Sequence, residues 1–279
     1  MDTVKLPVIY TCFPGGKHKV LTMSFDDGRT EDRRLVSIFN HYGIRGTFNV
    51  NSGLKSDEQR IPLSEYPSLY AGHEVACHTY THPTIARCPM EQIVRQVLLD
   101  REILEDTMGY PVRGLALPNG SDSEEIERVL PSLGIRYARS VKSTGGFAMP
   151  DTYLPWDSTC HFNHGLMELG KQFADLYKTQ YLYMMYVWGH SYEFTNYDNW
   201  DLIVDFCRMI GGRDDIWYAT NIEIVDYMDA AGRLQFTAAG DMVHNPNAIS
   251  VWISVDDRKM EIPAGQTVRL FDKKKAPAL

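Results

Sequence analysis

The 279-residue sequence has few cysteines and lacks any Cys-x-x-Cys pair. Its five cysteines are widely spaced: Cys12, Cys77, Cys88, Cys160 and Cys207. An odd number at this spacing argues against a disulfide framework and against a cysteine-based zinc site. We therefore expect buried or partly buried free thiols, as in a protein of a reducing compartment.

Long apolar runs and an excess of positive charge are also missing. No stretch is apolar enough over a sufficient length to span a bilayer, and residues 1–14 hold no apolar core of signal-peptide length. The sequence as given therefore predicts a cytoplasmic protein, or a secreted or envelope-associated one if a signal has been removed. The formal net charge of -8 argues against nucleic acid or an anionic membrane as the main partner. Nothing indicates an oligomeric state.

Short apolar runs alternate with amphipathic stretches over most of the chain. Runs typical of buried strands occur at 20–25, 46–50, 74–77, 113–117, 137–141, 182–188 and 216–219. Helical periodicity occurs at 30–42, 89–108, 123–130, 166–179, 200–210 and 222–230. Repeated strand-then-helix units predict a parallel sheet with helices outside, and seven such units favour an α/β barrel over an open sheet.

The pattern changes after residue 232. Strand-like runs at 251–255 and 267–270 are separated by turn residues rather than by helices. We therefore expect a barrel over residues 1–232 and a small antiparallel β extension over 233–279 that packs on it. No second independent domain is predicted.

Two adjacent carboxylates, Asp26 and Asp27, end the first barrel strand and precede Gly28. In a parallel α/β barrel the active-site residues lie at the C-terminal ends of the strands. Taken alone, the motif is also typical of a solvated Asp-Gly turn.

Two histidines, His78 and His82, follow the strand 74–77. Imidazoles four positions apart can reach one metal ion, although such a pair is also common on surface turns. Two histidines and one carboxylate form a frequent catalytic metal site with open positions for water and substrate. The remaining aspartate is then free to take a proton from water.

Two further strand ends carry candidate groups. His190 follows the strand 182–188, where it can act as a general acid, and Glu193 is close enough in sequence to orient it. A structural bond to a neighbouring loop is the alternative for His190. The segment 116–120 forms a loop whose backbone N–H groups can face an oxyanion, or simply a turn.

In this order the motifs resemble those of the polysaccharide deacetylases of carbohydrate esterase family 4, the NodB-homology enzymes, over about residues 20–227. The resemblance implies a distorted (β/α)7-type TIM-like barrel that binds a divalent metal, usually Zn²⁺. Co²⁺ and Ni²⁺ suit the same ligands. It implies the following roles: Asp26 as general base, Asp27, His78 and His82 as metal ligands, His190 as catalytic acid, and the backbone N–H of Asn119 as oxyanion donor.

The sequence departs from the family pattern in two motifs. The family often has an arginine that orients the base, and Ala116 stands in its place; Arg113 is nearby without being a clear substitute. The motif of an acid followed by tryptophan has its closest counterpart at 154–161. There, Trp156 could line a sugar-binding wall and His161 could tune the site, or both could be core or loop residues. Together with Trp188 and Glu193 they are the candidate substrate-binding residues.

The sequence thus predicts a metal-dependent hydrolase that removes acetyl groups from an N-acetylated or O-acetylated carbohydrate. Two alternatives stay open. One is a non-catalytic carbohydrate-binding protein on the same fold. The other is a hydrolase of small non-sugar amides.

Overall fold

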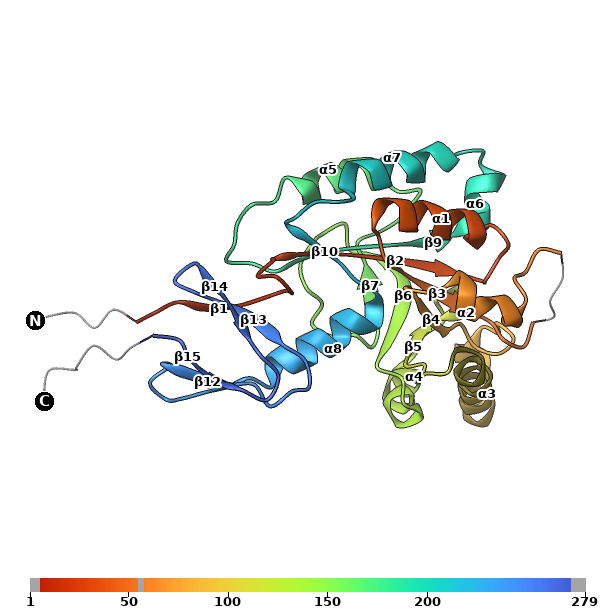
Figure 1. Ribbon diagram of the computed structural model, residues 1–279. Helices are drawn as coiled ribbons and strands as arrows, with labels where there is room; N and C mark the ends of the chain where they lie inside the picture. Colours follow the sequence, from red (N-terminus) through yellow and green to blue (C-terminus); the bar gives the residue numbers. More distant parts are fainter. Residues whose placement is uncertain (1–5, 55–57, 272–279) are drawn as a thin grey trace, which may run out of the picture.

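The computed structural model describes residues 6–54 and 58–271, which form an α/β barrel with a β extension at one side (Figure 1). The first barrel strands pair in parallel in the order of the sequence. They are β2 (Lys19–Asp26), β3 (Gly46–Val50), β4 (Glu74–Cys77), β5 (Gly114–Ala116) and β6 (Tyr137–Ser143).

The barrel closes through a strand that the sequence did not predict. β7 (Trp156–Ser158) pairs with β6, and β8 (Cys160–His161) pairs with β9 (Tyr183–His190). Only Thr159 separates β7 from β8, and β9 pairs with β2 along its full length. The sheet therefore returns to its first strand, so the predicted α/β barrel is confirmed.

One of the runs assigned to the ring has a different place. β10 (Ile216–Tyr218) pairs with residues 19–21 of β2, whereas β3 pairs with residues 23–26. β10 therefore lies beside the N-terminal half of β2. The segment 156–161 takes the position in the ring that was predicted for the strand 216–219.

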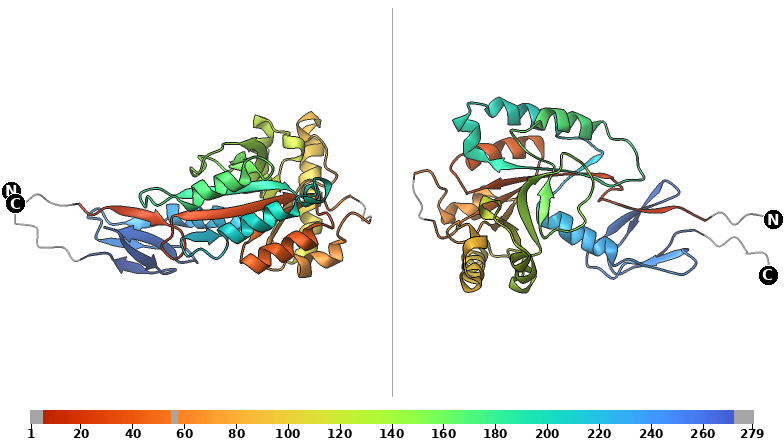
Figure 2. Two further views of the ribbon diagram at one scale, coloured as in Figure 1. Left: turned by 90° about the horizontal axis from the view of Figure 1, so that it is seen from above. Right: turned by 180° about the vertical axis from the view of Figure 1, so that it is seen from behind.

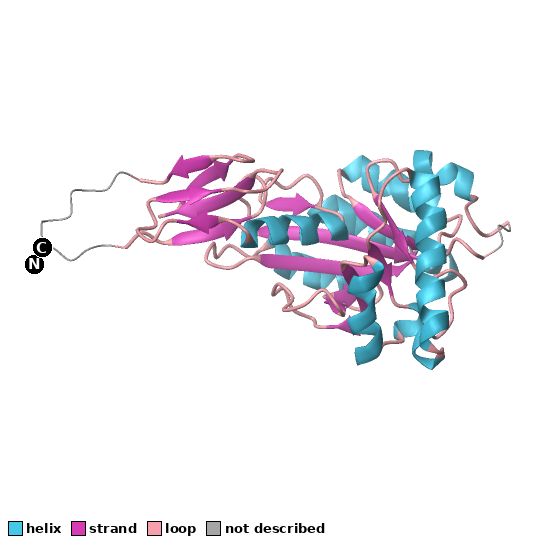
Figure 3. Cartoon of the chain, turned by 90° about the horizontal axis from the view of Figure 1, so that it is seen from below, coloured by secondary structure: helices cyan, strands magenta, loops and turns pink. Residues whose placement is uncertain are grey.

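Helices cover the outside of the barrel (Figures 2 and 3). The longer ones are α1 (Asp32–Tyr42), α3 (Met90–Met108), α5 (Leu166–Ala174), α7 (Trp200–Ile210) and α8 (Asn221–Gly232). The shorter ones are α2 (Tyr66–Leu69), α4 (Glu124–Val129), α6 (Ser191–Asn196), and the 3₁₀ turns η1 (Leu63–Glu65), η2 (Ile85–Arg87), η3 (Pro118–Gly120) and η4 (Leu130–Leu133). α1 and α3 end where Gly43 and Gly109 adopt the left-handed conformation that glycine allows.

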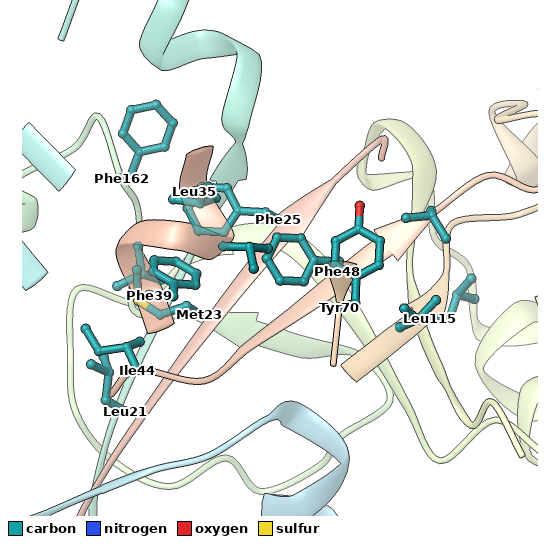
Figure 4. Close-up of a cluster of buried hydrophobic side chains, with 14 of the residues drawn as sticks. Leu21, Met23, Phe25, Leu35, Phe39, Ile44, Phe48, Tyr70, Leu115 and Phe162 are labelled. Atoms are coloured by element: carbon teal, nitrogen blue, oxygen red, sulfur yellow. The ribbon is translucent and has the colours of Figure 1, made fainter. Parts of the chain in front are cut away.

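The strands turn alternate side chains to the helices and to the barrel interior, because neighbouring Cβ atoms point to opposite faces. On β2, Leu21, Met23 and Phe25 face the helices and belong to the main apolar core (Figure 4). The Phe25 ring lies 5.8 Å from that of Phe39 on α1, edge to face. Burial of each such side chain contributes about 1.5–3 kcal/mol.

The other face of the strands fills the interior with two kinds of side chain. Near the N-terminal end, Trp156 packs against Tyr137 and Tyr186, with ring centroids 5.6 and 4.8 Å away. Near the C-terminal end, the buried interior is polar and holds Asp26 and Arg139. The candidate site lies at this polar end.

The β extension consists of two small antiparallel sheets that share an apolar core. Their strands are β1 (Ile9–Cys12), β13 (Val251–Val255) and β14 (Arg258–Ile262) in one, and β11 (Gln235–Phe236), β12 (Met242–His244) and β15 (Thr267–Arg269) in the other. The hydroxyl of Tyr227 on α8 donates to Cys12 O at 2.6 Å and accepts from Trp252 N at 2.9 Å. The extension therefore includes an N-terminal strand that the prediction over 233–279 left out, and the division at residue 232 stays a prediction.

Two smaller expectations also have an outcome. All five cysteines are free thiols, and Cys88 alone among them is partly exposed. Within the described ranges, no helix combines the length and the apolarity that crossing a membrane requires.

Candidate active site

Three predicted metal ligands converge at the C-terminal ends of β2 and β4. One ligand atom from each of Asp27, His78 and His82 lies within 4.8 Å of the other two. The Nε2 atoms of both histidines are 4.0 Å from Asp27 Oδ1, and their rings meet edge to face at 4.7 Å. The fold therefore brings together the three side chains that the sequence predicted as metal ligands.

The buried His78 ring is fixed in one tautomer. Its Nδ1 lies 2.8 Å from Ala116 O, and because a carbonyl only accepts, Nδ1 must donate. The lone pair of Nε2 then faces Asp27. Burial lowers the pKa of His78, which favours the neutral ring that a metal ion requires. The backbone N–H of His78 donates to the buried Asp100 at 3.0 Å.

The loops that carry the site hold unusual backbone conformations. Four non-glycine residues at its strand ends have positive φ: Asp27 (80°), Thr79 (62°), His82 (57°) and Asn119 (56°). Such conformations cost about 1–3 kcal/mol each and persist where the surroundings enforce them. Here Asn51 Nδ2 donates to Thr79 O at 2.8 Å, and Arg60 Nη1 donates to Asp27 O at 2.7 Å.

Asp26 lies beside this cluster and is almost fully buried. Arg139 Nη2 donates to its Oδ2, and Asn49 Nδ2 donates to its Oδ1 at 2.8 Å. Burial alone would raise the pKa of Asp26, but the Arg139 charge and the imidazoles of His78 and His190 lower it overall. The carboxylate is therefore ionised and can accept a proton.

Arg139 fills the place of the arginine that the family pattern led us to seek near Ala116. It belongs to β6, and its register partner on β5 is Ala116 itself. Its side chain has no exposed surface, and its guanidinium lies 4.3 Å from the ring of Trp188. The guanidinium thus comes from the neighbouring strand at the level of the expected position.

His190 ends β9 directly opposite Asp26 in the parallel register. Its Nε2 lies 4.0 Å from Asp26 Oδ2, while its Nδ1 lies 3.3 Å from Glu193 Oε2. Burial lowers the pKa of His190, but the bond to Glu193 and the charge of Asp26 outweigh it, so the net pKa is raised. The ring can therefore carry a proton close to the metal-ligand cluster.

A cavity of about 480 Å³ opens beside Asp27. It is lined by Asp27, Arg29, Glu31, Gln59, Tyr192 and Asn196. The ring of Tyr192 lies 5.2 Å from that of His190, and the Arg29 guanidinium lies 5.3 Å from the same tyrosine ring. Apart from Asp27, no lining residue was predicted.

The remaining predicted residues lie in different surroundings. Asn119 is in η3 after β5, and its side chain donates to Thr84 Oγ1 at 3.1 Å. Trp188 is half-buried beside Arg139, and its ring meets that of His161 edge to face at 4.6 Å. Trp156 is fully buried and has no surface with which to contact a sugar, so we do not retain it among the site residues.

Residues 14–138, a little under half of the chain, match the family model described as Polysaccharide deacetylase. Over these residues the chain is similar to the polysaccharide deacetylases. All three of the converging ligands and Asp26 fall inside the match, while Arg139 and His190 fall outside it.

Two curated relatives illustrate the extent of this similarity. It is 29% identical over 128 residues to the peptidoglycan-N-acetylmuramic acid deacetylase PdaC of Bacillus subtilis, which covers 45% of this chain and 26% of PdaC. It is 28% identical over 130 residues to a chitooligosaccharide deacetylase of Sinorhizobium fredii, which covers 46% of this chain and 54% of that protein. The matched region thus spans about a quarter of the first relative and about half of the second.

Solved structures of the polysaccharide deacetylase family share the fold. A Mycobacterium smegmatis protein assigned to these deacetylases aligns with a TM-score of 0.60 at 17% identity, covering 82% of this chain and 95% of that one. The Xyl-CE4 domain of a xylanase from the hindgut metagenome of Trinervitermes trinervoides aligns with a TM-score of 0.52 at 15% identity, covering 76% and 92%. The distorted barrel predicted from the resemblance is confirmed.

Several residues of the candidate site were not predicted. Arg139 carried one signal, since an arginine inside an apolar strand must find a buried partner. Asn49 and Asp100 gave none, because an asparagine in a strand and an acid in a helix are common on surfaces. Their roles depend on contacts between segments far apart in the sequence.

Proposed function

We propose that this chain hydrolyses acetyl groups on an acetylated carbohydrate, with a divalent cation held by Asp27, His78 and His82. The observation that carries the proposal is the position of Asp26. Its Oδ2 lies 3.8 Å from His78 Nε2 and 4.0 Å from His190 Nε2. An ionised carboxylate thus lies between the ligand cluster and a protonatable imidazole.

The three ligands fit a divalent metal by their chemistry. Two imidazoles and one carboxylate form the donor set of many catalytic zinc sites, and Co²⁺ or Ni²⁺ suits it as well. The bond from His78 Nδ1 to Ala116 O fixes the tautomer that a ligand needs. When bound, such a cation polarises the acetyl carbonyl and lowers the pKa of water.

Asp26 is the proposed general base. It takes a proton from the attacking water, and the oxygen of that water forms the new bond to the acetyl carbon. Arg139 and Asn49 hold both carboxylate oxygens of Asp26, so that it is oriented before substrate arrives. The backbone N–H of Asn119 is the proposed donor to the oxyanion.

His190 is the proposed general acid. Its Nδ1 is engaged by Glu193, which leaves Nε2 for the substrate. When the bond between the acetyl carbon and the amine nitrogen breaks, the Nε2 proton goes to that nitrogen. The net reaction consumes one water and releases acetate and the free amine; an acetyl ester would release an alcohol instead.

The substrate class is proposed from the family and the cavity. The relatives are named as deacetylases of peptidoglycan, chitin and chitooligosaccharide. A polar cavity of about 480 Å³ next to Asp27, with Tyr192 in its wall, offers both hydrogen-bonding groups and an aromatic face to a sugar.

An acetate-release assay tests the proposal. Purified protein with Zn²⁺ or Co²⁺ is incubated with a chitooligosaccharide, peptidoglycan fragments, acetylated xylan and small non-sugar amides such as acetamide. We expect acetate from at least one carbohydrate and its loss on chelation. Release from small amides alone would support the non-sugar alternative, and saccharide binding without release would support a binding protein.

A further inference from the structure

We propose that His161 is a positioning residue for the acid step: it fixes Glu193, and Glu193 fixes the ring of His190. The inference rests on the proposed function and deepens it. It concerns three side chains from two parts of the chain, β8 and the junction of β9 with α6, which the fold places beside each other.

A single carboxylate oxygen joins the two imidazoles. Glu193 Oε2 lies 3.1 Å from His161 Nε2 and 3.3 Å from His190 Nδ1. The same oxygen lies 3.2 Å from the backbone N of His190, which donates to it. The three side chains are 12–21% exposed, so the bonds form with little competition from water.

The backbone decides the tautomer of His161. The N–H of Asn163 donates to His161 Nδ1 at 3.2 Å, so this nitrogen carries a lone pair and no proton. The ring hydrogen is then on Nε2, which donates to Glu193. His161 therefore acts as a neutral donor that restrains the carboxylate without adding a charge.

The restraint matters because of where His190 points. With Nδ1 bonded to Glu193, the opposite ring nitrogen Nε2 faces Asp26 and the ligand cluster. Glu193 lies in the first turn of α6, and beside the backbone N–H of His190, the side chain of His161 ties its carboxylate to the barrel wall. Without that tie the carboxylate can rotate away and release the imidazole ring from its orientation.

The local sequence accommodates this arrangement. His161 pairs in register with Trp188, next to Gly189. A Cβ at Gly189 would lie 2.3 Å from Phe162 Cδ1 and 3.4 Å from His161 Nε2. Glycine at this position therefore lets the segment 161–162 pack directly on β9, at the distance that the bond from His161 to Glu193 needs.

A second metal site is the competing interpretation, since ligand atoms of His161, His190 and Glu193 also lie within 4.8 Å of one another. The distances of 3.1 and 3.3 Å from Glu193 are those of direct hydrogen bonds, and the lone pair on His161 Nδ1 is already used. We therefore favour the hydrogen-bonded arrangement, and metal stoichiometry distinguishes the two.

The test uses leaving groups that do or do not need a proton. His161→Phe keeps the ring and removes the donor, whereas His161→Gln restores an N–H donor to Glu193. His41→Phe is the matched control, because His41 is an exposed histidine on α1 and is not among the residues of the candidate site. Each protein is assayed on an N-acetylated oligosaccharide, whose amine leaving group requires protonation, and on 4-nitrophenyl acetate, whose phenolate does not.

We expect His161→Phe to lower kcat on the oligosaccharide about 10- to 100-fold with KM unchanged. On 4-nitrophenyl acetate we expect a change below about threefold, and His161→Gln recovers most of the lost activity, as expected of a donor that acts through Glu193. Equal losses on both substrates, or no loss on either, would overturn the role of His161. So would two bound metal ions per chain in the wild type.

Long-range ¹H–¹⁵N correlation spectra of the wild-type imidazoles give a readout that needs no turnover. We expect the His161 Nδ1 to resonate as an unprotonated nitrogen. A protonated Nδ1 would overturn the inference even if the enzyme is active. If the wild type hydrolyses neither substrate, the proposed function itself fails, and the role of His161 in an acid step fails with it.

Discussion

Arg139 on β6 donates a hydrogen bond to Asp26 on β2 across the barrel interior, from the position directly paired with Ala116 on β5. Both Ala116 and Arg139 are fully buried, and Arg139 extends its guanidinium to Asp26. The adjacent strand thus supplies a guanidinium to Asp26, the proposed general base. A sheet makes this exchange possible because register partners project from neighbouring positions on the same face.

We predict that Arg139→Met lowers both activity and stability. Removing one partner of a buried pair leaves an uncompensated carboxylate, which costs about 3–5 kcal/mol of unfolding free energy. Acetate release should fall about 10- to 100-fold because Asp26 is no longer held. Urea unfolding and kcat measure the two effects.

Arg136→Met is the control for that experiment, because Arg136 pairs with Asp229 near the surface. It should change unfolding free energy by less than about 1 kcal/mol. The double variant of Arg139→Met with Asp26→Asn should regain part of the stability without regaining activity. Unchanged kcat in Arg139→Met would contradict the role given to Arg139.

The roles of the two adjacent aspartates can be separated. Asp26→Asn is expected to lower kcat about 10²- to 10⁴-fold, since it removes the proposed general base, while metal content stays as in the wild type. His78→Ala is expected to lose both metal and activity, because the variant lacks one of the three proposed ligands. Metal per chain is measured by mass spectrometry after dialysis against limiting Zn²⁺, with His164→Ala as control. Loss of metal from Asp26→Asn would instead make Asp26 a ligand.

Most residues of the candidate site could be predicted because they follow the ends of strands. Asp26, Asp27 and His78 come directly after recognisable apolar runs, and parallel strands bring such positions to one end of a barrel. The strand–helix alternation gave the fold for the same reason. The strands that were not predicted are short: β7 and β8 contain too few residues to show the alternating apolar pattern of a strand.

Burial explains the remaining differences. For Trp156 the sequence left open a sugar-binding wall or a core or loop position, and it packs among three tyrosines in the barrel interior. Its neighbour His161, five residues on, does reach the site. A one-dimensional pattern does not distinguish them, because the direction of each side chain depends on where the strand meets β6 and β9.

We predict that Tyr192, in the wall of the cavity beside Asp27, contributes to substrate binding. Tyr192→Ala should raise KM about 3- to 10-fold through loss of an aromatic contact worth about 0.5–1.5 kcal/mol, while Tyr192→Phe should keep KM nearly unchanged. Steady-state kinetics on an acetylated oligosaccharide measure the change. Tyr197→Ala is the control, since Tyr197 is 60% exposed just after α6 and is not among the residues lining the cavity. Equal KM values for the two alanine variants would rule out a contact with Tyr192.

We predict that Glu74 makes the stability of the fold depend on pH, separately from catalysis. Its buried carboxylate accepts from Thr47 Oγ1 at 2.9 Å, Tyr137 OH at 2.8 Å and Ile222 N at 3.0 Å. Burial raises the pKa of Glu74 to about 7, whereas an unfolded chain has a glutamate pKa of about 4.3. Between these values the folded state binds one more proton than the unfolded state.

The sign of the effect follows from that difference. The stability due to the bound proton is fully present below the unfolded pKa and is lost as the pH rises toward about 7, at about 1.4 kcal/mol per pH unit. Glu74→Gln has no such proton to lose, so its stability relative to the wild type should increase from pH 5 to pH 7 and then level off. Urea unfolding at unit intervals of pH measures this, with Glu102→Gln at an exposed position of α3 as control. Parallel stability curves for wild type and Glu74→Gln would show that Glu74 does not titrate in this range.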